Sequence, residues 1–360
     1  MKTLAQLEKS IERFEAAFWR KERGIRPPVG VTSRATWLPV RYLRREFRRS
    51  EVLPEDVRPE AVATDYEFAF ANRAVSSDDW MPFAAPWRAI PWLEAACGCG
   101  VRFSTGALAP EPCVGSPDAL KDASIPARPA WLERLRSETE RLVAAAPADC
   151  WISPTILRGP SDVLAAMRGL TNFLVDLYDN PEAIDAAAER VNRLFMDTLD
   201  VHFEVVGPKL GGYGHIFGYW APGRTIAIQE DVMGMCAPSL YRDIFMKHNC
   251  EIVRHLGAHV LFHLHSTGFQ HYRDVLTIPG LAGLQMTIES NGPELSALVP
   301  VFQEILERSR LALFVDSRFD QLHDILPKLP SEGLYLVIPD DRIRTEKEYE
   351  DFVTEHWKHD

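Results

Sequence analysis

Two histidines, His263 and His265, stand one residue apart in the apolar run VLFHLHSTG at residues 260–268. Side chains at positions i and i+2 leave a β-strand on the same face, so the two imidazoles can converge on one point. Converging imidazole nitrogens can hold a metal ion or a substrate. The alternative is a pair of hydrogen-bonded core histidines, because histidine is only intermediate in its preference for burial.

Acidic residues follow other apolar runs, at positions where parallel strands would end. They are Glu230 and Asp231 after TIAI (225–228), Asp316 after ALFV (312–315), and Asp340 and Asp341 after LVIP (336–339). Carboxylates can bind metals or act as general bases, but Asp before a helix is also a common N-cap. In a barrel of alternating strands and helices, these strand ends would meet beside the histidine pair.

Strand-like and helix-like segments alternate along most of the chain. Strands are predicted at residues 28–33, 150–156, 211–217, 259–264, 281–287, 311–316 and 333–338, and helices at 160–178, 181–206, 238–256, 293–308, 320–329 and 345–356. This alternation indicates βα units around a parallel sheet and predicts an α/β fold, a (β/α)8 TIM barrel. A doubly wound open sheet is the alternative, but no glycine-rich dinucleotide fingerprint follows the first strand.

The whole chain, residues 1–360, is predicted to form a single barrel domain. Residues from 1 to about 115 would form an N-terminal helical and irregular extension with the first strand, and residues from about 116 to 360 the regular βα units. The formal net charge of −11 argues against a nucleic-acid partner. No apolar run approaches the ~18 residues of a membrane span, and the charged start lacks a signal-peptide apolar region. We therefore expect a cytoplasmic protein with a small-molecule substrate and no membrane contact.

Six cysteines, at positions 97, 99, 113, 150, 236 and 250, are present in this long chain. They do not indicate a disulfide framework. Cys97 and Cys99 with Cys113 are an alternative metal site, although a structural zinc site usually shows two ligand pairs.

Several segments, taken in order, carry a resemblance to a known family. They are residues 90–99 (IPWLEAACGC), the helical region 159–181 with RGL and LYDNP, residues 229–232 (QEDV) and residues 237–242 (APSLYR). They resemble the uroporphyrinogen decarboxylase-like family, which includes zinc methyltransferases that serve corrinoid proteins. The likeness spans about residues 25–355 and implies a barrel enzyme. Members of the family are found as monomers and as dimers, which leaves a homodimer open.

The methyltransferase branch of this family binds zinc through an H-x-C strand end and a cysteine after the last strand. In this chain His263 and His265 occupy the first motif, and the second position falls on Asp341 or Asp340. A His, His, Asp set suits a catalytic divalent ion, and the resemblance implies zinc. The implied reaction is methyl transfer from a corrinoid on a partner protein, or from a small-molecule donor. Glu230 or Asp231 would then orient or deprotonate the accepting nucleophile.

Two further functions remain open at this stage. The first is a metal-free decarboxylase of a porphyrin-like or other polycarboxylate, because Arg34 matches part of the carboxylate-binding motif of the decarboxylase branch. The second is a non-catalytic subunit that binds a corrinoid protein, since both family cysteines are replaced. Candidate substrate-binding residues are Tyr213, His215, Tyr219, Trp220, Glu94 and Asp316. Aromatic residues near strand ends are at least as often part of the core.

Overall fold

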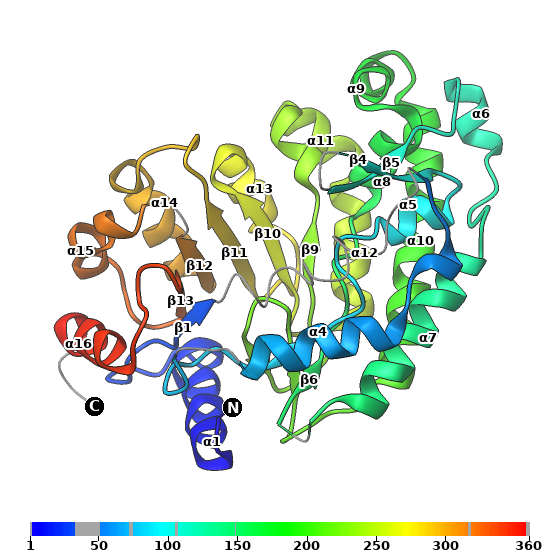
Figure 1. Cartoon of the computed structure of the whole chain (residues 1–360). Coiled ribbons are helices and arrows are strands. Elements are labelled where there is room, and N and C mark those ends of the chain that lie inside the picture. The colour runs from blue at the N-terminus through cyan, green and yellow to red at the C-terminus, as the bar shows by residue number, and fades with distance from the viewer. Residues whose placement is uncertain are drawn as a thin grey trace.

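The computed structural model describes residues 2–32, 51–71, 75–104, 107–147, 149–315 and 318–357. Its centre is a six-stranded sheet in which each strand runs parallel to its neighbours (Figure 1). In spatial order the strands are β1 (Val29–Thr32), β13 (Leu334–Pro339), β12 (Leu311–Val315), β11 (Gly283–Ile288), β10 (Leu261–His265) and β9 (Ala227–Gln229). The sequence prediction of an α/β protein with a parallel sheet is confirmed at this level.

The central strands are apolar because both of their faces are covered. Every residue of β12 (LALFV) and of β13 (LYLVIP) is buried. Strands that are buried on both faces read as continuous apolar runs rather than as alternating ones. A polar side chain within these runs therefore needs a specific partner, and this requirement becomes important at the site.

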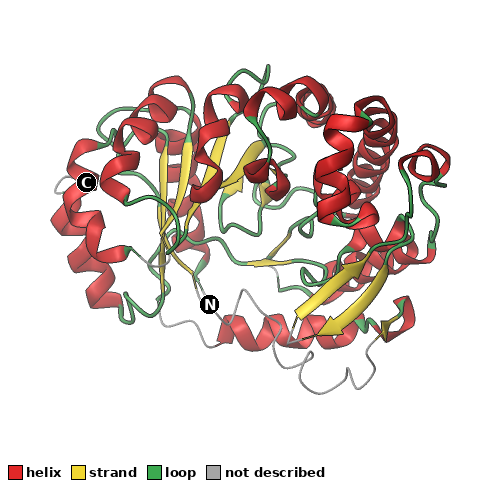
Figure 2. Cartoon of the chain, turned by 90° about the horizontal axis from the view of Figure 1, so that it is seen from above, coloured by secondary structure: helices red, strands yellow, loops and turns green. Residues whose placement is uncertain are grey.

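Helices lie along the outside of the parallel strands, as the view from above shows (Figure 2). The helices in the first half of the chain are α1 (Leu4–Arg13), the π-helix η1 (Phe14–Trp19), η2 (Pro54–Asp56), α4 (Pro59–Ala71), α5 (Trp92–Ala96), α6 (Pro117–Asp122), α7 (Ala130–Ala145), α8 (Pro160–Arg168) and α9 (Leu170–Asp179). The others are α10 (Pro181–Val205), η3 (Asp231–Met235), α11 (Pro238–Ile244), α12 (Met246–Leu256), η4 (Ser266–His271), α13 (Tyr272–Val275), α14 (Leu295–Arg308), η5 (Phe319–Gln321), α15 (Leu322–Ile325), η6 (Leu326–Lys328) and α16 (Glu346–His356).

Local sequence signals explain several helix ends. Thr345 and Glu348 form the predicted capping box at the start of α16. Gly257 ends α12 with a φ of 96°, in the left-handed region that favours glycine. Gly169, with a φ of 80°, divides the predicted helix 160–178 into α8 and α9.

The remaining strands are short. Strand β3 (Phe83–Ala84) pairs in parallel with β6 (Trp151–Ile152), and β7 (Tyr213–Gly214) pairs in antiparallel with β8 (Trp220–Ala221) instead of forming a parallel strand over 211–217. A separate antiparallel sheet contains β2 (Glu51–Val52), β4 (Gly100–Ser104) and β5 (Ala107–Glu111).

The described part of the chain has no continuous ladder that closes a barrel. Proline explains why β3 and β6 are so short: Pro82 precedes β3, and Pro154 follows β6 after one residue. Proline has no N–H and cannot donate to a ladder in mid-sheet. The segment that follows β6 contacts the central sheet through an isolated parallel bridge between Arg158 and Gln229. In the described residues, no helix is both long enough and apolar enough to cross a membrane.

Candidate metal centre

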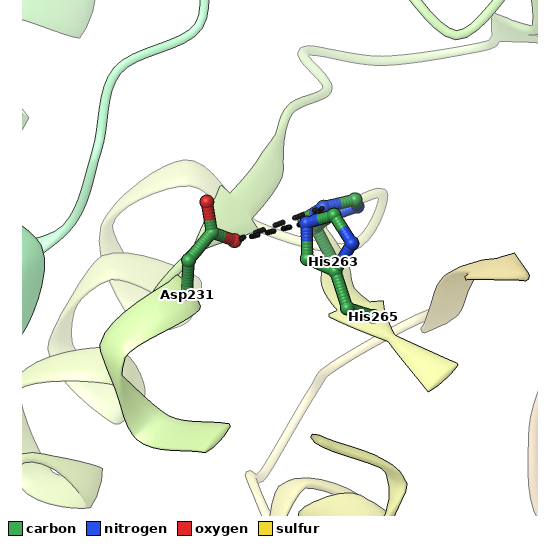
Figure 3. A group of neighbouring side chains, drawn as sticks. All are labelled: Asp231, His263 and His265. Carbon is green, nitrogen blue, oxygen red and sulfur yellow. Dashed lines mark hydrogen bonds and ion pairs between the residues drawn. The ribbon is translucent and has the colours of Figure 1, made fainter. Parts of the chain in front are cut away.

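Three side chains with metal-binding atoms meet at the end of two neighbouring strands. His263 and His265 lie on β10, and Asp231 is the first residue of η3, directly after β9 and Glu230 (Figure 3). The Nε2 atoms of the two histidines are 3.1 Å apart. Oδ1 of Asp231 lies 3.4 Å from Nε2 of His265 and 3.9 Å from Nε2 of His263. The three atoms therefore face a common point.

Asp231 is held in this position by its neighbours. Its Oδ2 atom accepts a hydrogen bond of 2.6 Å from Nε2 of Gln229, which leaves Oδ1 to face the histidines. Its backbone N–H and that of Val232 donate to the carboxylate of Asp162, at 2.9 and 2.8 Å. Asp162 thus satisfies free amide groups at the start of η3, as an N-cap does, although it comes from another helix, α8.

The other ring nitrogen of each histidine also faces a specific acceptor. Gln285, opposite His263 in the register of β10 and β11, accepts a hydrogen bond from Nδ1 of that histidine. The orientation of its amide group is set by a second hydrogen bond, from Nε2 of Gln285 to Oγ1 of Thr287 at 3.1 Å. For His265, a carboxylate oxygen of Glu289 lies 3.0 Å from Nδ1. Acceptors at Nδ1 leave the lone pair of Nε2 available to a metal ion.

The charges of the three groups depend on one another. Burial lowers the pKa of His263 to about 4, so this ring is neutral at pH 7. The hydrogen bond to Asp231 raises the pKa of His265, and Glu289 acts in the same direction. Burial alone would raise the pKa of Asp231, but its interactions with His265 and His263 outweigh burial and lower it. The centre therefore combines a neutral imidazole with a carboxylate and an imidazole that share a proton when no cation is present.

The histidines open into a cavity of about 400 Å³ at the carboxyl ends of the central strands. It is lined by Thr32, Ile156, Phe217, Gln229, His263, His265, Thr287, Phe314, Val315, Val337 and Pro339. The ring of Phe217 stacks on His263, with centroids 5.4 Å apart. A largely apolar pocket with a few convergent polar groups is the usual form of a small-molecule site. A second three-residue group, His323, Glu355 and His356, also brings donor atoms close together, but none of its residues lines this cavity.

Glu230 and Asp231, the two neighbouring acids predicted to take part in catalysis, point in different directions. Asp231 joins the histidines, whereas the side chain of Glu230 turns into the protein and is 1% exposed. Oε2 of Glu230 accepts hydrogen bonds from the backbone N–H and the hydroxyl of Ser161, at the start of α8. Burial, reinforced by the charge of Asp162, raises the pKa of Glu230 well above its ordinary range. Glu230 is therefore a buried group that connects η3 to α8.

Of the aromatic residues predicted to bind substrate, Tyr219 and Trp220 are buried in the core, and none of the three lines the cavity. The hydroxyl group of Tyr219 shares a hydrogen bond of 3.1 Å with Oγ1 of Thr225, and the carbonyl of Trp220 accepts one of 2.7 Å from Nε1 of Trp19. Tyr213 is half-buried and packs edge-on against Phe203. Tyr219 and Trp220 belong to the hydrophobic core and Tyr213 packs against it, which is the alternative role of strand-end aromatic residues.

His215 also has a structural position. Its ring stacks on Tyr219, and its two ring nitrogens each lie 3.2 Å from a backbone nitrogen, those of Phe217 and Ala227. Burial lowers the pKa of His215 to about 3. This neutral ring holds the backbone segment that carries Phe217 into the cavity, but His215 itself does not line the cavity.

The remaining predicted site residues do not reach the histidines among the described residues. Glu94 is buried and forms an ion pair of 2.5 Å with Nε of Arg158. Asp341, predicted as the third metal ligand, is exposed in the turn after β13 and is not part of the group of donor atoms. A loop after the last strand would have to fold inward to bring its carboxylate to β10. Arg34 and Asp316 lie outside the described residues.

Sequence reasoning did not identify the supporting residues Gln285, Glu289 and Phe217. A signal for Gln285 was present, because Gln285 and Thr287 are alternate polar residues within the otherwise apolar segment GLQMTI of β11. Alternate residues share one face of a strand, so a buried Gln at this spacing indicates a polar partner on the neighbouring strand. Phe217 carried no such signal.

The fold and the site together define a class of protein: an α/β protein with a central parallel sheet and polar groups at its carboxyl edge. No protein-family model and no curated protein sequence matches this chain. A solved structure, a methyltransferase from Methanosarcina mazei, has a similar fold, with a TM-score of 0.62 over 94% of this chain and 96% of that one. The two sequences are 15% identical, so the similarity concerns the fold.

Proposed function

We propose that this protein is a metal-dependent methyltransferase of the uroporphyrinogen decarboxylase-like type, with a divalent ion held by His263, His265 and Asp231. The observation that carries this proposal is the spacing of three donor atoms, which are 3.1, 3.4 and 3.9 Å apart. Ligand atoms that surround a tetrahedral zinc ion at about 2.0–2.2 Å lie ~3.3–3.6 Å from one another. The residues therefore fit a three-ligand site that keeps a fourth position open toward the cavity.

Electrostatics supports the same assignment. Nδ1 of His263 has a hydrogen-bond acceptor, and a carboxylate oxygen of Glu289 lies 3.0 Å from Nδ1 of His265, so the two Nε2 atoms face each other and a carboxylate oxygen of Asp231. Three electron-rich atoms at this spacing repel one another unless a cation or a proton lies between them. A zinc ion fits this donor set, since two imidazoles and one carboxylate with an open position form a catalytic site.

The proposed fold is a distorted (β/α)8 barrel. The six strands of the central sheet and the parallel pair of β3 and β6 would make up its eight strands. Backbone contacts lie at both gaps in the ladder. The N–H of Gly159, after β6, donates to the carbonyl of Gln229 at 2.7 Å, and that of Asp79, before β3, donates to the carbonyl of Val29 at 2.7 Å. The proposed site would then occupy the end of the barrel where such enzymes carry their active sites.

The chemistry of the proposed reaction follows from the centre and its cavity. A bound divalent ion would supply Lewis-acid activation of a nucleophile. Ile156, Phe314 and Val315 line the cavity and exclude water from the reacting atoms. The carboxylate of Glu289 lies beside Nδ1 of His265 and stabilises positive charge on that ring. A corrinoid on a partner protein, or a small-molecule donor, would provide the methyl group.

A polycarboxylate decarboxylase is less well supported. In the described part of the chain, the lining of the cavity includes no Arg or Lys side chain. Several substrate carboxylates would need cationic partners in such a pocket. The similar fold of a methyltransferase also favours the transferase.

Metal analysis of the full chain, purified without an affinity tag, tests this proposal. We expect about one equivalent of zinc or another divalent ion in the wild type and in Asp341→Asn, and loss of that metal in Asp231→Asn. Retention of metal by Asp231→Asn would refute the ligand set, and a metal-free wild type after supplementation would refute the metal centre. Transfer of the methyl group from methylcobalamin to a panel of thiols, followed by the change in corrinoid absorbance, then tests the reaction itself.

A further inference from the structure

Two cysteines face each other at the base of the hairpin formed by β4 and β5. Gly100 at the start of β4 is opposite Glu111 at the end of β5. Cys99 directly precedes β4 and Cys113 closely follows β5, so the two cysteines lie side by side. Their sulfur atoms are 3.7 Å apart, within hydrogen-bond distance for thiols, and both cysteines are free. This pair lies outside the proposed metal centre, and none of its residues lines the large cavity.

The two thiols have opposite environments. Cys99 is completely buried, whereas Cys113 is exposed. The hydrogen bond from Cys99 lowers the pKa of Cys113, and the positive charge of Arg128 acts in the same direction. The same hydrogen bond, together with burial, raises the pKa of Cys99. Cys113 is therefore the nucleophilic, accessible sulfur of the pair, since the thiolate is the reactive form.

We propose that Cys113 is a site of oxidation by hydroperoxides and that Cys99 converts the oxidised residue into a disulfide. In the first step, the Cys113 sulfur attacks the terminal peroxide oxygen, the O–O bond breaks, and the products are a sulfenic acid and water or an alcohol. In the second step, the Cys99 sulfur attacks the sulfenic sulfur, an S–S bond forms, and water leaves with the thiol proton. The hydroperoxide is the oxidant and is reduced by two electrons.

The backbone around the pair fits both steps. Gly98 has a φ of 113°, and a side chain at this position would lie 3.7 Å from the sulfur of Cys113. The absence of that side chain leaves room beside the reacting sulfur. A disulfide requires the sulfur atoms to approach from 3.7 Å to ~2.05 Å, a small displacement for cysteines that flank paired strands.

Peptide mapping of the reduced full chain after a brief treatment with hydrogen peroxide tests this proposal. We expect a Cys99–Cys113 disulfide, with modification of Cys113 at least about tenfold faster than of the partly buried Cys250 on α12. In Cys99→Ser, the sulfenic acid at Cys113 should persist and be trapped by dimedone. Cys113→Ser should give neither product.

Cys250→Ser is the matched control and should form the disulfide as the wild type does. Three results would overturn the proposal: equal oxidation of Cys113 and Cys250, a disulfide from Cys113 to Cys97, or no trapped sulfenic acid in Cys99→Ser. Thermal unfolding of each variant establishes that it is folded, and Cys113→Ser tests the exposed position independently of the buried one. The experiment requires no enzymatic activity, so failure of the proposed function does not affect it.

Discussion

Gln285 determines which ring nitrogen of His263 faces the candidate metal centre. The two residues are opposite each other in the register of β10 and β11, and Gln285 accepts the hydrogen bond from Nδ1 of His263. A second bond, to Thr287, prevents the amide group from turning over. The neighbouring strand thus fixes the tautomer that leaves Nε2 unprotonated.

Replacement of Gln285 by Leu should weaken metal binding by about 10- to 100-fold, because an outer partner of a ligating histidine is lost. Without Gln285, Nδ1 of His263 would have no acceptor, and the ring could adopt the tautomer that carries its proton on Nε2. Competition with a chelating dye measures the affinity. Gln303→Leu on the exposed face of α14 is the matched control. Equal affinity in both variants would show that Gln285 does not orient the ligand.

The sequence predicted the sheet well where its strands are long and apolar. The predicted strands 259–264, 281–287 and 311–316 match β10, β11 and β12 within a few residues at each end, because continuous apolar runs of this length leave few alternatives. The prediction was weaker for 211–217, where Gly211, Gly212 and Gly214 favour a turn, and the chain forms the antiparallel pair β7 and β8.

For the site, the sequence identified what local spacing can show. The i and i+2 positions of His263 and His265 put both rings on one face, and the structure places their Nε2 atoms 3.1 Å apart. The third member of the group could not be chosen from spacing, because Asp231 and Asp341 both follow apolar runs. Asp231 follows β9, the strand adjacent to β10, and this adjacency is a property of the tertiary fold.

Metal affinity should decrease as the pH falls from 8 to 6. Asp231 raises the pKa of His265, so a proton at Nε2 competes with the metal at a higher pH than in a free histidine. His263, with its pKa near 4, adds no competition in this range. Below the pKa of His265, the affinity should fall by about tenfold per pH unit, the slope for one proton. Zinc titrations at pH 8, 7 and 6 measure this slope.

Glu289→Gln provides the control for that pH dependence. It removes a negative charge that lies 3.0 Å from the His265 ring, so the pKa of His265 should fall and the loss of affinity should begin at lower pH. An unchanged onset, or a slope of two protons, would contradict the assignment of the competing proton to His265.

Asp79→Ala should strongly destabilise the protein. The carboxylate of Asp79 is completely buried, and it accepts hydrogen bonds from Ser10, Arg26 and the backbone N–H of Val29, at 3.0, 2.9 and 3.0 Å, and from Arg13. Its removal would leave two buried guanidinium groups without this partner, at a cost of about 3–5 kcal/mol. Urea denaturation measures the free energy of unfolding.

The exposed Asp179 supplies the control for this substitution, and Asp179→Ala should change the free energy of unfolding by less than about 0.5 kcal/mol. Burial alone would raise the pKa of Asp79, but Arg26 and Arg13 lower it below the ordinary value. The stability that Asp79 contributes is therefore present above the unfolded pKa and is lost as the pH falls through the folded one. Similar stabilities of the two variants at pH 7 would contradict this role.

Glu138→Gln should stabilise the protein more at pH 9 than at pH 7. Glu138 is fully buried on α7, where one oxygen accepts a 2.7 Å hydrogen bond from the N–H of Trp87 and the other has no partner. Burial raises the pKa of Glu138 to about 8, above its ordinary value of 4.5. Its favourable contribution is complete below the unfolded pKa and is lost as the pH rises through about 8. Between pH 7 and 9 the wild type should lose about 1 kcal/mol of stability relative to Glu138→Gln.

Urea titrations at both pH values measure this difference. Glu140→Gln, on the exposed face of the same helix, is the control and should follow the wild type. If the difference in the free energy of unfolding between Glu138→Gln and the wild type were the same at pH 7 and pH 9, the Glu138 carboxyl group would not titrate in this range.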